Sequence, residues 1–158
     1  MRPLAVIDID GVLADVRHRL HHLQQRPKDW DAFFAAAADD PPLEEGLAVV
    51  RKLAADHDVV YLTGRPERLR AVTERWLEAN SLPRGELHMR KHSDRRPARF
   101  TKPRLLEQLA RRRSVAVVVD DDLAVCAAYE AAGFPVLRAE WMVEEPTLFD
   151  AQEQQGRT

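Results

Sequence analysis

Residues 4–12 read LAVIDIDGV, so that an unbroken apolar run leads into Asp8 and Asp10. A run of this kind is typical of a strand that is buried on both faces of a parallel sheet. Similar runs follow at residues 59–62, 86–89, 115–119 and 134–137. Because amphipathic stretches separate these runs, we expect an α/β fold with a doubly wound sheet of about five parallel strands and helices on both faces.

The stretches between the later runs predict four helices. Leucine and valine at helical spacing predict a helix over residues 43–55. Proline suits the first position of a helix, so we expect the next two helices to begin at Pro66 and Pro103. The last predicted helix spans residues 123–132 and ends at Gly133, because glycine is a common C-terminal cap.

The length of 158 residues fits a single domain, which we place at residues 1–143. Residues 14–42 interrupt the first crossover and are too many for a bare loop, so we expect a small cap insertion there. Residues 144–158 are acidic and rich in glutamine, with few apolar side chains, which predicts a flexible tail.

Composition argues against several classes of protein. No apolar run approaches the roughly 18 residues of a membrane-spanning helix, and the first residues lack the pattern of a signal peptide. Cys126 is the single cysteine, which argues against a disulfide framework and against a cysteine-based zinc site. We therefore expect a cytoplasmic protein with no membrane partner.

Charge is unevenly distributed along the chain, although the net charge is only −2. Residues 84–113 contain eleven Lys and Arg against three acidic residues and carry +8, whereas the rest of the chain carries −10. A local basic segment indicates either an anionic partner, such as phosphate or nucleic acid, or an arginine-rich face exposed to water.

Acidic residues stand where two of the predicted strands end. Asp8 and Asp10 follow the first strand, and residues 120–122, which are all aspartates, follow the fourth. Because ligands of open α/β sheets bind beyond the carboxyl ends of the strands, we expect these carboxylates to share one rim. Carboxylates this close need a cation, and oxygen ligands without cysteine favour Mg²⁺. Asp122 is better explained as the N-cap of the following helix.

Two further residues favour an anionic substrate at this rim. Lys102 is expected just ahead of a helix N-terminus, where a cation is unfavourable unless an anion lies between it and the metal. The alternative is an exposed lysine that points to water. Thr63 follows the second strand, and its hydroxyl is suited to donate to a phosphoryl oxygen or to act as an ordinary strand-end hydroxyl.

The order of these residues resembles the haloacid dehalogenase superfamily. The resemblance rests on Asp8-Ile9-Asp10-Gly11-Val12, followed by Thr63, Lys102 and the pair Asp120-Asp121. It spans about residues 4–140 and implies a Rossmann-like three-layer sandwich with a small cap.

The resemblance also implies how the reaction proceeds. Asp8 would be the nucleophile that attacks phosphorus and becomes an aspartyl-phosphate, and Asp10 would exchange protons as acid and base. That role requires a raised pKa for Asp10, which we expect from carboxylates crowded around it. The resemblance also distinguishes between reactions within the superfamily, because an acidic residue at the position of Asp10 favours phosphoryl transfer over carbon–halogen cleavage.

Ligand roles follow from the same resemblance. Thr63 and Lys102 would hold the oxygens of the transferring phosphoryl group. The ligands of Mg²⁺ would be Asp8, the backbone carbonyl of Asp10, Asp120 and Asp121.

Two stretches show a closer resemblance, to the phosphatase domain of polynucleotide kinase–phosphatase. Residues 88–96 read HMRKHSDRR, and residues 63–65 read TGR. In that family, arginines matching Arg65 and Arg90 help to bind the phosphate end of the substrate. We add Gly11, Gly64 and Arg96 to the expected substrate-binding residues. The chain contains no G-x-x-x-x-G-K-[ST] loop, so we expect no kinase half within it, and a separate kinase or ligase could be its partner.

Together these features predict a Mg²⁺-dependent phosphomonoesterase that acts on a phosphorylated nucleic-acid end or a nucleotide. Of the possible substrates, we favour the 3′-phosphate end of a polynucleotide. One alternative is a nucleotidase or another small-molecule phosphatase, over whose substrate the insertion would close. A second alternative is a non-catalytic subunit that binds phosphorylated ends for a partner.

The predicted insertion carries three histidines and three aromatic residues. The histidines have a spacing that can bind a metal, but no cysteine or carboxylate supports them and zinc is disfavoured. The aromatic residues suit base stacking or packing against the sheet, and their spacing favours packing. These two groups are His18, His21 and His22, and Trp30, Phe33 and Phe34.

Overall fold

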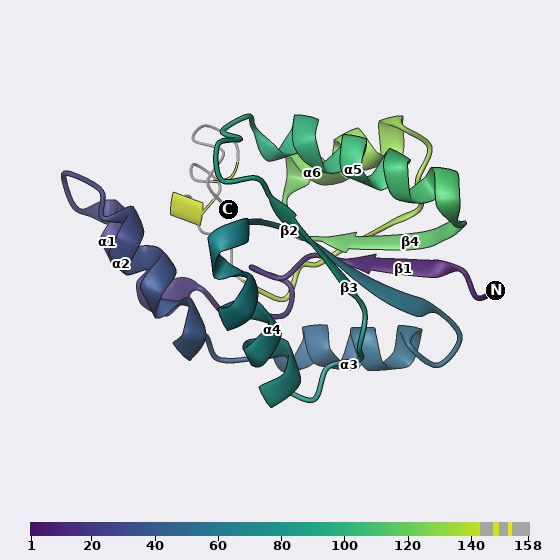
Figure 1. Ribbon diagram of the computed structural model, residues 1–158, viewed down its shortest axis with the longest axis horizontal. Helices are drawn as coiled ribbons and strands as arrows, with labels where there is room; N and C mark the ends of the chain where they lie inside the picture. Colours follow the sequence, from purple (N-terminus) through teal and green to yellow (C-terminus); the bar gives the residue numbers. More distant parts are fainter. Residues whose placement is uncertain (143–146, 149–151, 153–158) are drawn as a thin grey trace.

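A parallel sheet lies at the centre of the protein (Figure 1), as seen in a computed structural model that describes residues 1–142, 147, 148 and 152. Within these residues the sheet has five strands in the order β3-β2-β1-β4-β5, and every neighbouring pair is parallel. The strands are β1 (Leu4–Ile7), β2 (Asp58–Pro66), β3 (Glu86–Arg90), β4 (Val115–Asp120) and β5 (Val136–Arg138). The expected α/β fold of parallel strands is confirmed.

Two pairs of helices cover the two faces of the sheet (Figure 1). One face packs against α3 (Glu44–Leu53) and α4 (Arg70–Ala79), and the other against α5 (Ala98–Arg112) and α6 (Leu123–Ala131). Successive side chains of β1 alternate between the two cores, so that Ala5 and Ile7 join the first and Leu4 and Val6 the second. The chain therefore forms the expected three-layer sandwich.

The register of the central strands aligns the residues that carry chemistry. Ile7 at the end of β1 pairs with both Tyr61 of β2 and Val119 of β4. Asp8, which follows β1, and Asp120, the last residue of β4, therefore lie at the same edge of the sheet. The chain continues from β1 to β2 and β3 on one side and returns to β4 and β5 on the other. Asp8 thus lies at the point where the strand order reverses, where doubly wound sheets bind ligands.

The predicted helices over residues 43–55 and 123–132 are confirmed within two residues at each end. Asp122 caps α6 as expected, because its side chain accepts hydrogen bonds from the N–H groups of Ala124 and Val125 at 2.9 and 3.2 Å. The prediction that Pro66 begins a helix is wrong. Strand β2 continues through Pro66, and the short helix η3 (Glu67–Leu69) precedes α4.

Helix α5 also begins earlier than expected. We expected Pro103 to open it and Lys102 to precede it, but the helix begins at Ala98, and both residues lie inside it. The extended residue Pro97 ends the preceding loop, and its carbonyl accepts from the N–H groups of Phe100 and Thr101. Pro103 lacks an N–H and costs the helix one hydrogen bond, to the carbonyl of Arg99. The argument that placed Lys102 at a helix N-terminus is therefore wrong.

Residues 14–42, called the insertion below, lie beyond the carboxyl edge of the sheet (Figure 1). They contain η1 (Arg17–Arg19), α1 (His21–Gln24), α2 (Trp30–Ala35) and η2 (Ala36–Asp39). Phe33 and Phe34 are buried in a core that the insertion shares with Leu69 and Met142. Packing of these aromatic residues is confirmed, but their expected contact with the sheet is wrong because this core is separate from the two sheet cores.

Every helix among the described residues is too short or too polar to cross a lipid bilayer. The predicted tail over residues 144–158 lies outside the described residues, apart from 147, 148 and 152.

Candidate active site

Asp8, Asp120 and Asp121 form a carboxylate cluster at the carboxyl ends of β1 and β4. One carboxylate oxygen from each residue lies within 4.8 Å of the other two. Asp8 and Asp120 are buried, and Asp121 is half-buried. The register described above brings these residues together although more than a hundred residues separate them in the sequence.

Gly11 packs directly against this cluster. Its φ of +81° lies in the left-handed region, and a Cβ atom at this position would lie 2.2 Å from Asp121 Oδ2. Any larger residue would strain the backbone and displace the carboxylate. The structure therefore places Gly11 where it leaves room for Asp121.

Lys102 neutralises part of the cluster. Its ammonium nitrogen lies 2.8 Å from Asp120 Oδ2 and 3.1 Å from Asp8 Oδ1, and its side chain is 4% exposed. Burial alone would lower the pKa of Lys102, but the carboxylates of Asp120 and Asp8 outweigh it and raise this pKa well above its ordinary value. Lys102 is therefore a fixed cation between the two strand ends.

One lysine does not balance three carboxylates. Burial and the charge of Asp120 raise the pKa of Asp8 to about 7. Burial and the charges of Asp8 and Asp120 likewise raise the pKa of Asp121 well above its ordinary value. These shifts show that the cluster gains a proton or a cation readily.

The donor set of the cluster fits a divalent cation. Asp8 Oδ2 and Asp121 Oδ1 are both buried, and neither has a hydrogen-bond partner within the described part of the chain. Carboxylate oxygens are the ligands that Mg²⁺ prefers, and a cation would satisfy both of these atoms. Among the described residues, this is the one group of three or more acidic, histidine or cysteine side chains that lie close enough to hold an ion. The expectation that no carboxylate supports the histidines of the insertion is wrong for His18, whose Nε2 lies 2.6 Å from Asp40 Oδ1.

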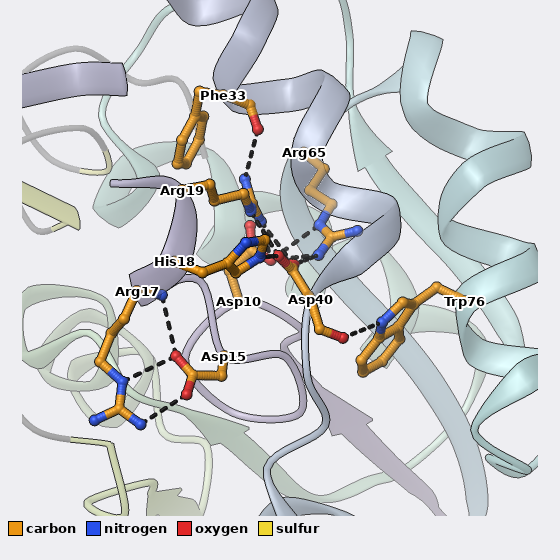
Figure 2. Close-up of polar contacts among 9 residues, drawn as sticks. All are labelled: Asp10, Asp15, Arg17, His18, Arg19, Phe33, Asp40, Arg65 and Trp76. Atoms are coloured by element: carbon orange, nitrogen blue, oxygen red, sulfur yellow. Dashed lines mark hydrogen bonds and ion pairs between the residues drawn. The ribbon is translucent and has the colours of Figure 1, made fainter. Parts of the chain in front are cut away.

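Asp10 leaves this cluster and turns toward two buried arginines (Figure 2). Arg65 donates to Asp10 Oδ1 from Nε at 2.9 Å and from Nη2 at 2.6 Å. Arg19 Nη2 lies 3.3 Å from the same oxygen. The carboxylates of Asp8 and Asp40 lie near Asp10, as expected, but the guanidinium groups of Arg65 and Arg19 also contact its carboxylate.

Asp40, at the end of the insertion, holds both arginines in place (Figure 2). Arg19 donates to its two carboxylate oxygens at 2.8 and 2.9 Å, and Arg65 Nη2 donates to Oδ2 at 3.0 Å. His18 Nε2 lies 2.6 Å from Asp40 Oδ1, and Trp76 Nε1 donates to the Asp40 carbonyl at 2.8 Å. The network thus ties the insertion to Asp10 and to the ends of β1 and β2.

Thr63 and Gly64 shape the end of β2. Thr63 is buried, and its hydroxyl oxygen accepts from the Arg65 N–H at 3.1 Å. The Gly64 carbonyl accepts from Arg90 Nε at 3.2 Å. These contacts fix residues 63–65 beside Asp10 and join β2 to the end of β3.

Arg90 and Arg96, which we expected to bind substrate, have different surroundings. Arg90 is buried, and its Nη1 donates to the carbonyls of Arg96 and Asp94 at 2.6 and 3.4 Å. Arg96 has a side chain that is 57% exposed and pairs with Asp94 at 2.8 Å. The hydrogen bonds from Arg96 lower the pKa of Asp94 to about 2. Arg90 therefore organises the loop 91–97, and Arg96 lies on the outside of that loop.

Sequence reasoning missed Arg19 and Asp40. Arg19 stands between Val16 and Leu23, at the spacing of an apolar helix face, and a charged residue on such a face signals a buried ion pair. Asp40 gives no comparable signal, because it follows a run of alanines and another aspartate. Its role becomes visible only when the insertion meets β2.

Comparison with known proteins gives one family and several structural relatives. Residues 3–141 match the family model of the polynucleotide kinase PNKP phosphatase domain. No curated protein matches the chain. The structure resembles a chain of the Pnkp1/Rnl/Hen1 complex with a TM-score of 0.70 at 19% identity, covering 87% of this chain and 46% of that one. The protein thus spans about half the length of that relative.

Two further structures share the fold over nearly their whole length. A haloacid dehalogenase-like hydrolase from Streptococcus pneumoniae has a TM-score of 0.60 at 10% identity, with 96% of this chain and 91% of that one covered. A haloacid dehalogenase family enzyme from Bacteroides thetaiotaomicron, in complex with magnesium and inorganic phosphate, has a TM-score of 0.55 at 11% identity, with coverage of 94% and 100%.

Proposed function

This chain belongs to the family of polynucleotide kinase phosphatase domains and is a phosphatase of the haloacid dehalogenase type, and from this premise we propose that it removes a 3′-phosphate from a polynucleotide in a Mg²⁺-dependent reaction. The placement of Asp8 carries the proposal. Its buried carboxylate contacts Lys102 and lies close to the two other aspartates of the cluster, at the edge where this fold binds ligands.

Asp8 acts as the nucleophile in the first step. A carboxylate oxygen of Asp8 attacks phosphorus, and a new P–O bond to Asp8 forms as the bond to the substrate oxygen breaks. Asp10 gives a proton to the departing oxygen, which leaves as the 3′-hydroxyl.

Water completes the reaction in the second step. Asp10 takes a proton from the attacking water, whose oxygen bonds to phosphorus as the bond to Asp8 breaks. Inorganic phosphate leaves, and both aspartates return to their starting states. Arg65 and Arg19 hold Asp10 Oδ1 throughout, so they fix the side chain that moves the proton.

The remaining residues bind the transferring group. Lys102 and the Thr63 hydroxyl contact phosphoryl oxygens, and Arg65 and Arg90 position the residues around them. Asp8, Asp120, Asp121 and the Asp10 carbonyl would hold Mg²⁺. When bound, the ion lowers the repulsion between Asp8 and an anionic substrate and stabilises charge on the phosphoryl oxygens. The structural relative that contains magnesium and phosphate supports this choice of metal.

A small-molecule phosphatase is the second candidate. It is favoured by the insertion, which lies beyond the same sheet edge as Asp8 and could cover a mononucleotide. The non-catalytic alternative is not retained, because the matching family is one of phosphatase domains and Lys102 lies beside Asp8.

The comparisons and the composition also support proposals about the partners and the location of the protein. One structural relative is a chain of the Pnkp1/Rnl/Hen1 complex, and the present chain spans about half the length of that relative. The occurrence of this relative in a complex supports a separate kinase or ligase partner. The cytoplasmic location stays a prediction that rests on the composition and on Cys126.

A substrate panel tests the proposal. It compares kcat/KM for DNA and RNA oligonucleotides with a 3′- or 5′-phosphate and for 3′- and 5′-mononucleotides, with Asp8→Asn as the blank. We expect the 3′-phosphorylated oligonucleotides to be the best substrates and to require Mg²⁺. A clear preference for mononucleotides would assign the second candidate function instead.

A further inference from the structure

Five residues at the start of α5 and in the preceding loop form an exposed basic surface, called the basic strip below: Arg95, Arg96, Arg99, Phe100 and Arg104. Phe100 is 54% exposed, which is unusual for so large an apolar side chain. Arg99 lies over its ring at 4.7 Å from the centroid. Proteins use this combination of an aromatic side chain and arginines to bind single-stranded nucleic acid.

On α5, the side chains of the basic strip lie on the exposed face of the helix, and Lys102 lies on the buried face. Thr101 and Lys102 are buried, whereas Arg99, Phe100 and Arg104 are exposed. At about 100° per residue, Phe100 points about 200° around the helix axis from Lys102. The same two turns of α5 therefore serve the carboxylate cluster on one side and an open surface on the other.

A groove of about 680 Å³ gives this surface its shape. Phe100, Arg99 and Arg104 line one wall, and Ala128 and Ala131 of α6 line the other. The small alanines leave space beside the Phe100 ring, so that a flat group has room to stack there. Glu107, three residues after Arg104 on α5, also lines this groove.

The strip borders a second, smaller depression beside the insertion. A small hollow of about 30 Å³ lies between the insertion and the loop 91–97, and Pro66, Arg68, His92 and Arg95 are among the residues that line it. Arg95 borders this hollow and the next residue, Arg96, borders the groove.

The loop that joins the hollow to the groove is held by a buried side chain. Arg90 donates to the carbonyls of Arg96 and Asp94 and also to that of Gly64, next to Thr63. The position of the basic strip is thus tied to the end of β2, which carries the phosphate-binding residues.

We propose that the basic strip binds the single-stranded part of the polynucleotide that precedes the terminal phosphate, with a base stacked on Phe100 and backbone phosphates on the arginines. The inference rests on the proposed function, because it assumes that the terminal phosphate lies at Asp8. It explains why the basic charge of residues 84–113 is concentrated around α5 although Lys102 alone reaches the carboxylate cluster. The proposal therefore predicts that the strip contributes to the binding of oligonucleotides and not to that of mononucleotides.

A length series of substrates tests the inference. KM and kcat are measured for 3′-phosphorylated oligonucleotides of one to ten nucleotides and for p-nitrophenyl phosphate, which occupies the chemical site alone. The variants are Phe100→Ala and the double variant Arg95→Ala/Arg104→Ala. Arg111→Ala, an exposed arginine at the far end of α5, is the matched control. Anisotropy of labelled decamers bound to Asp8→Asn variants reports affinity without turnover.

We expect KM for the native protein to fall as the oligonucleotide lengthens. Phe100→Ala should weaken decamer binding by about tenfold, which is the usual loss for one stacked base. The double variant should reduce the slope of log Kd against log salt by about 0.7 for each backbone phosphate that the strip no longer neutralises. Activity on the mononucleotide and on p-nitrophenyl phosphate should not change in either variant.

Two results would overturn the inference in distinguishable ways. If the native protein prefers the decamer but the strip variants behave like Arg111→Ala, the strip does not bind the strand and the proposed function stands. If the native protein hydrolyses p-nitrophenyl phosphate and mononucleotides but no oligonucleotide, the proposed function fails and the inference fails with it.

Discussion

Arg65 donates two hydrogen bonds to Asp10 Oδ1, at 2.6 and 2.9 Å, in a site where both side chains are at most 3% exposed. This contact joins the end of β2 to the segment after β1, and Asp40 extends it to the insertion. The side chain that we propose as acid and base therefore has its position set by residues 30 and 55 positions away in the sequence.

Arg65→Lys should impair the proton transfer more than the binding of substrate. Lysine keeps the positive charge but cannot form the two-nitrogen contact with Asp10. We expect kcat for an alkyl phosphate to fall by about ten- to a hundredfold, while KM changes little. Hydrolysis of p-nitrophenyl phosphate should be less affected, because its leaving group needs no acid. Arg75→Lys, an exposed arginine of α4, is the matched control and should leave both rates unchanged.

Lys102→Met should separate metal binding from catalysis. The change removes the cation between Asp8 and Asp120, so the cluster becomes more negative and should bind Mg²⁺ at least as tightly. We expect kcat to fall by about 10²–10³-fold, because a phosphoryl oxygen loses its cationic partner. Calorimetric titration with Mg²⁺ and steady-state kinetics measure the two effects. A loss of Mg²⁺ affinity with normal kcat would contradict the assigned role.

Gly11→Ala should disrupt the metal site by a local clash. The new Cβ would lie 2.2 Å from Asp121 Oδ2, so the carboxylate must move. Gly133→Ala is a matched control, because Gly133 has a φ of +90° but no atom of the described residues within 4 Å of the added Cβ. Both variants should lose about 1–2 kcal/mol of stability through backbone strain. Only Gly11→Ala should also lose the rise in Tm that Mg²⁺ produces.

Stability should depend on pH and on Mg²⁺ together. Burial and Asp120 raise the pKa of Asp8 to about 7, so the metal-free protein loses stability as the pH rises from about 4 through 7 and Asp8 must ionise. Mg²⁺ binds the ionised carboxylates and must displace protons at lower pH. We therefore expect a larger rise in Tm with Mg²⁺ at pH 8 than at pH 5. NaCl at matched ionic strength is the control, and an equal effect at both pH values would exclude Asp8 as a ligand.

Much of the fold could be predicted from the sequence because each strand is a short apolar run with its own ends. Val59 to Leu62 and Val115 to Val119 lie in the sheet as expected, and the aspartates after β1 and β4 meet because parallel strands share an edge. The sequence was misleading where two local signals for the start of a helix compete. Pro103 resembles a helix start, but Pro97 provides an earlier one, and α5 accepts the second proline in its interior.

The arginine network could not be predicted for a different reason. Arg19 and Asp40 lie far apart within the insertion, and Arg65 joins them only when the insertion packs over the end of β2. Periodicity shows which face of a segment is buried but not which buried charges meet. The carboxylate cluster was easier, because its members come from strand ends and the sheet topology places them.

The most direct test of the account traps the covalent state of Asp8. The protein is mixed with an oligonucleotide that carries a radiolabelled 3′-phosphate and Mg²⁺, quenched with acid during turnover, and digested for peptide mapping. We expect a label that hydroxylamine removes, located in the peptide that contains Asp8, and none in the Asp8→Asn variant. Release of labelled phosphate without any labelled protein, or at the same rate from Asp8→Asn, would contradict the account.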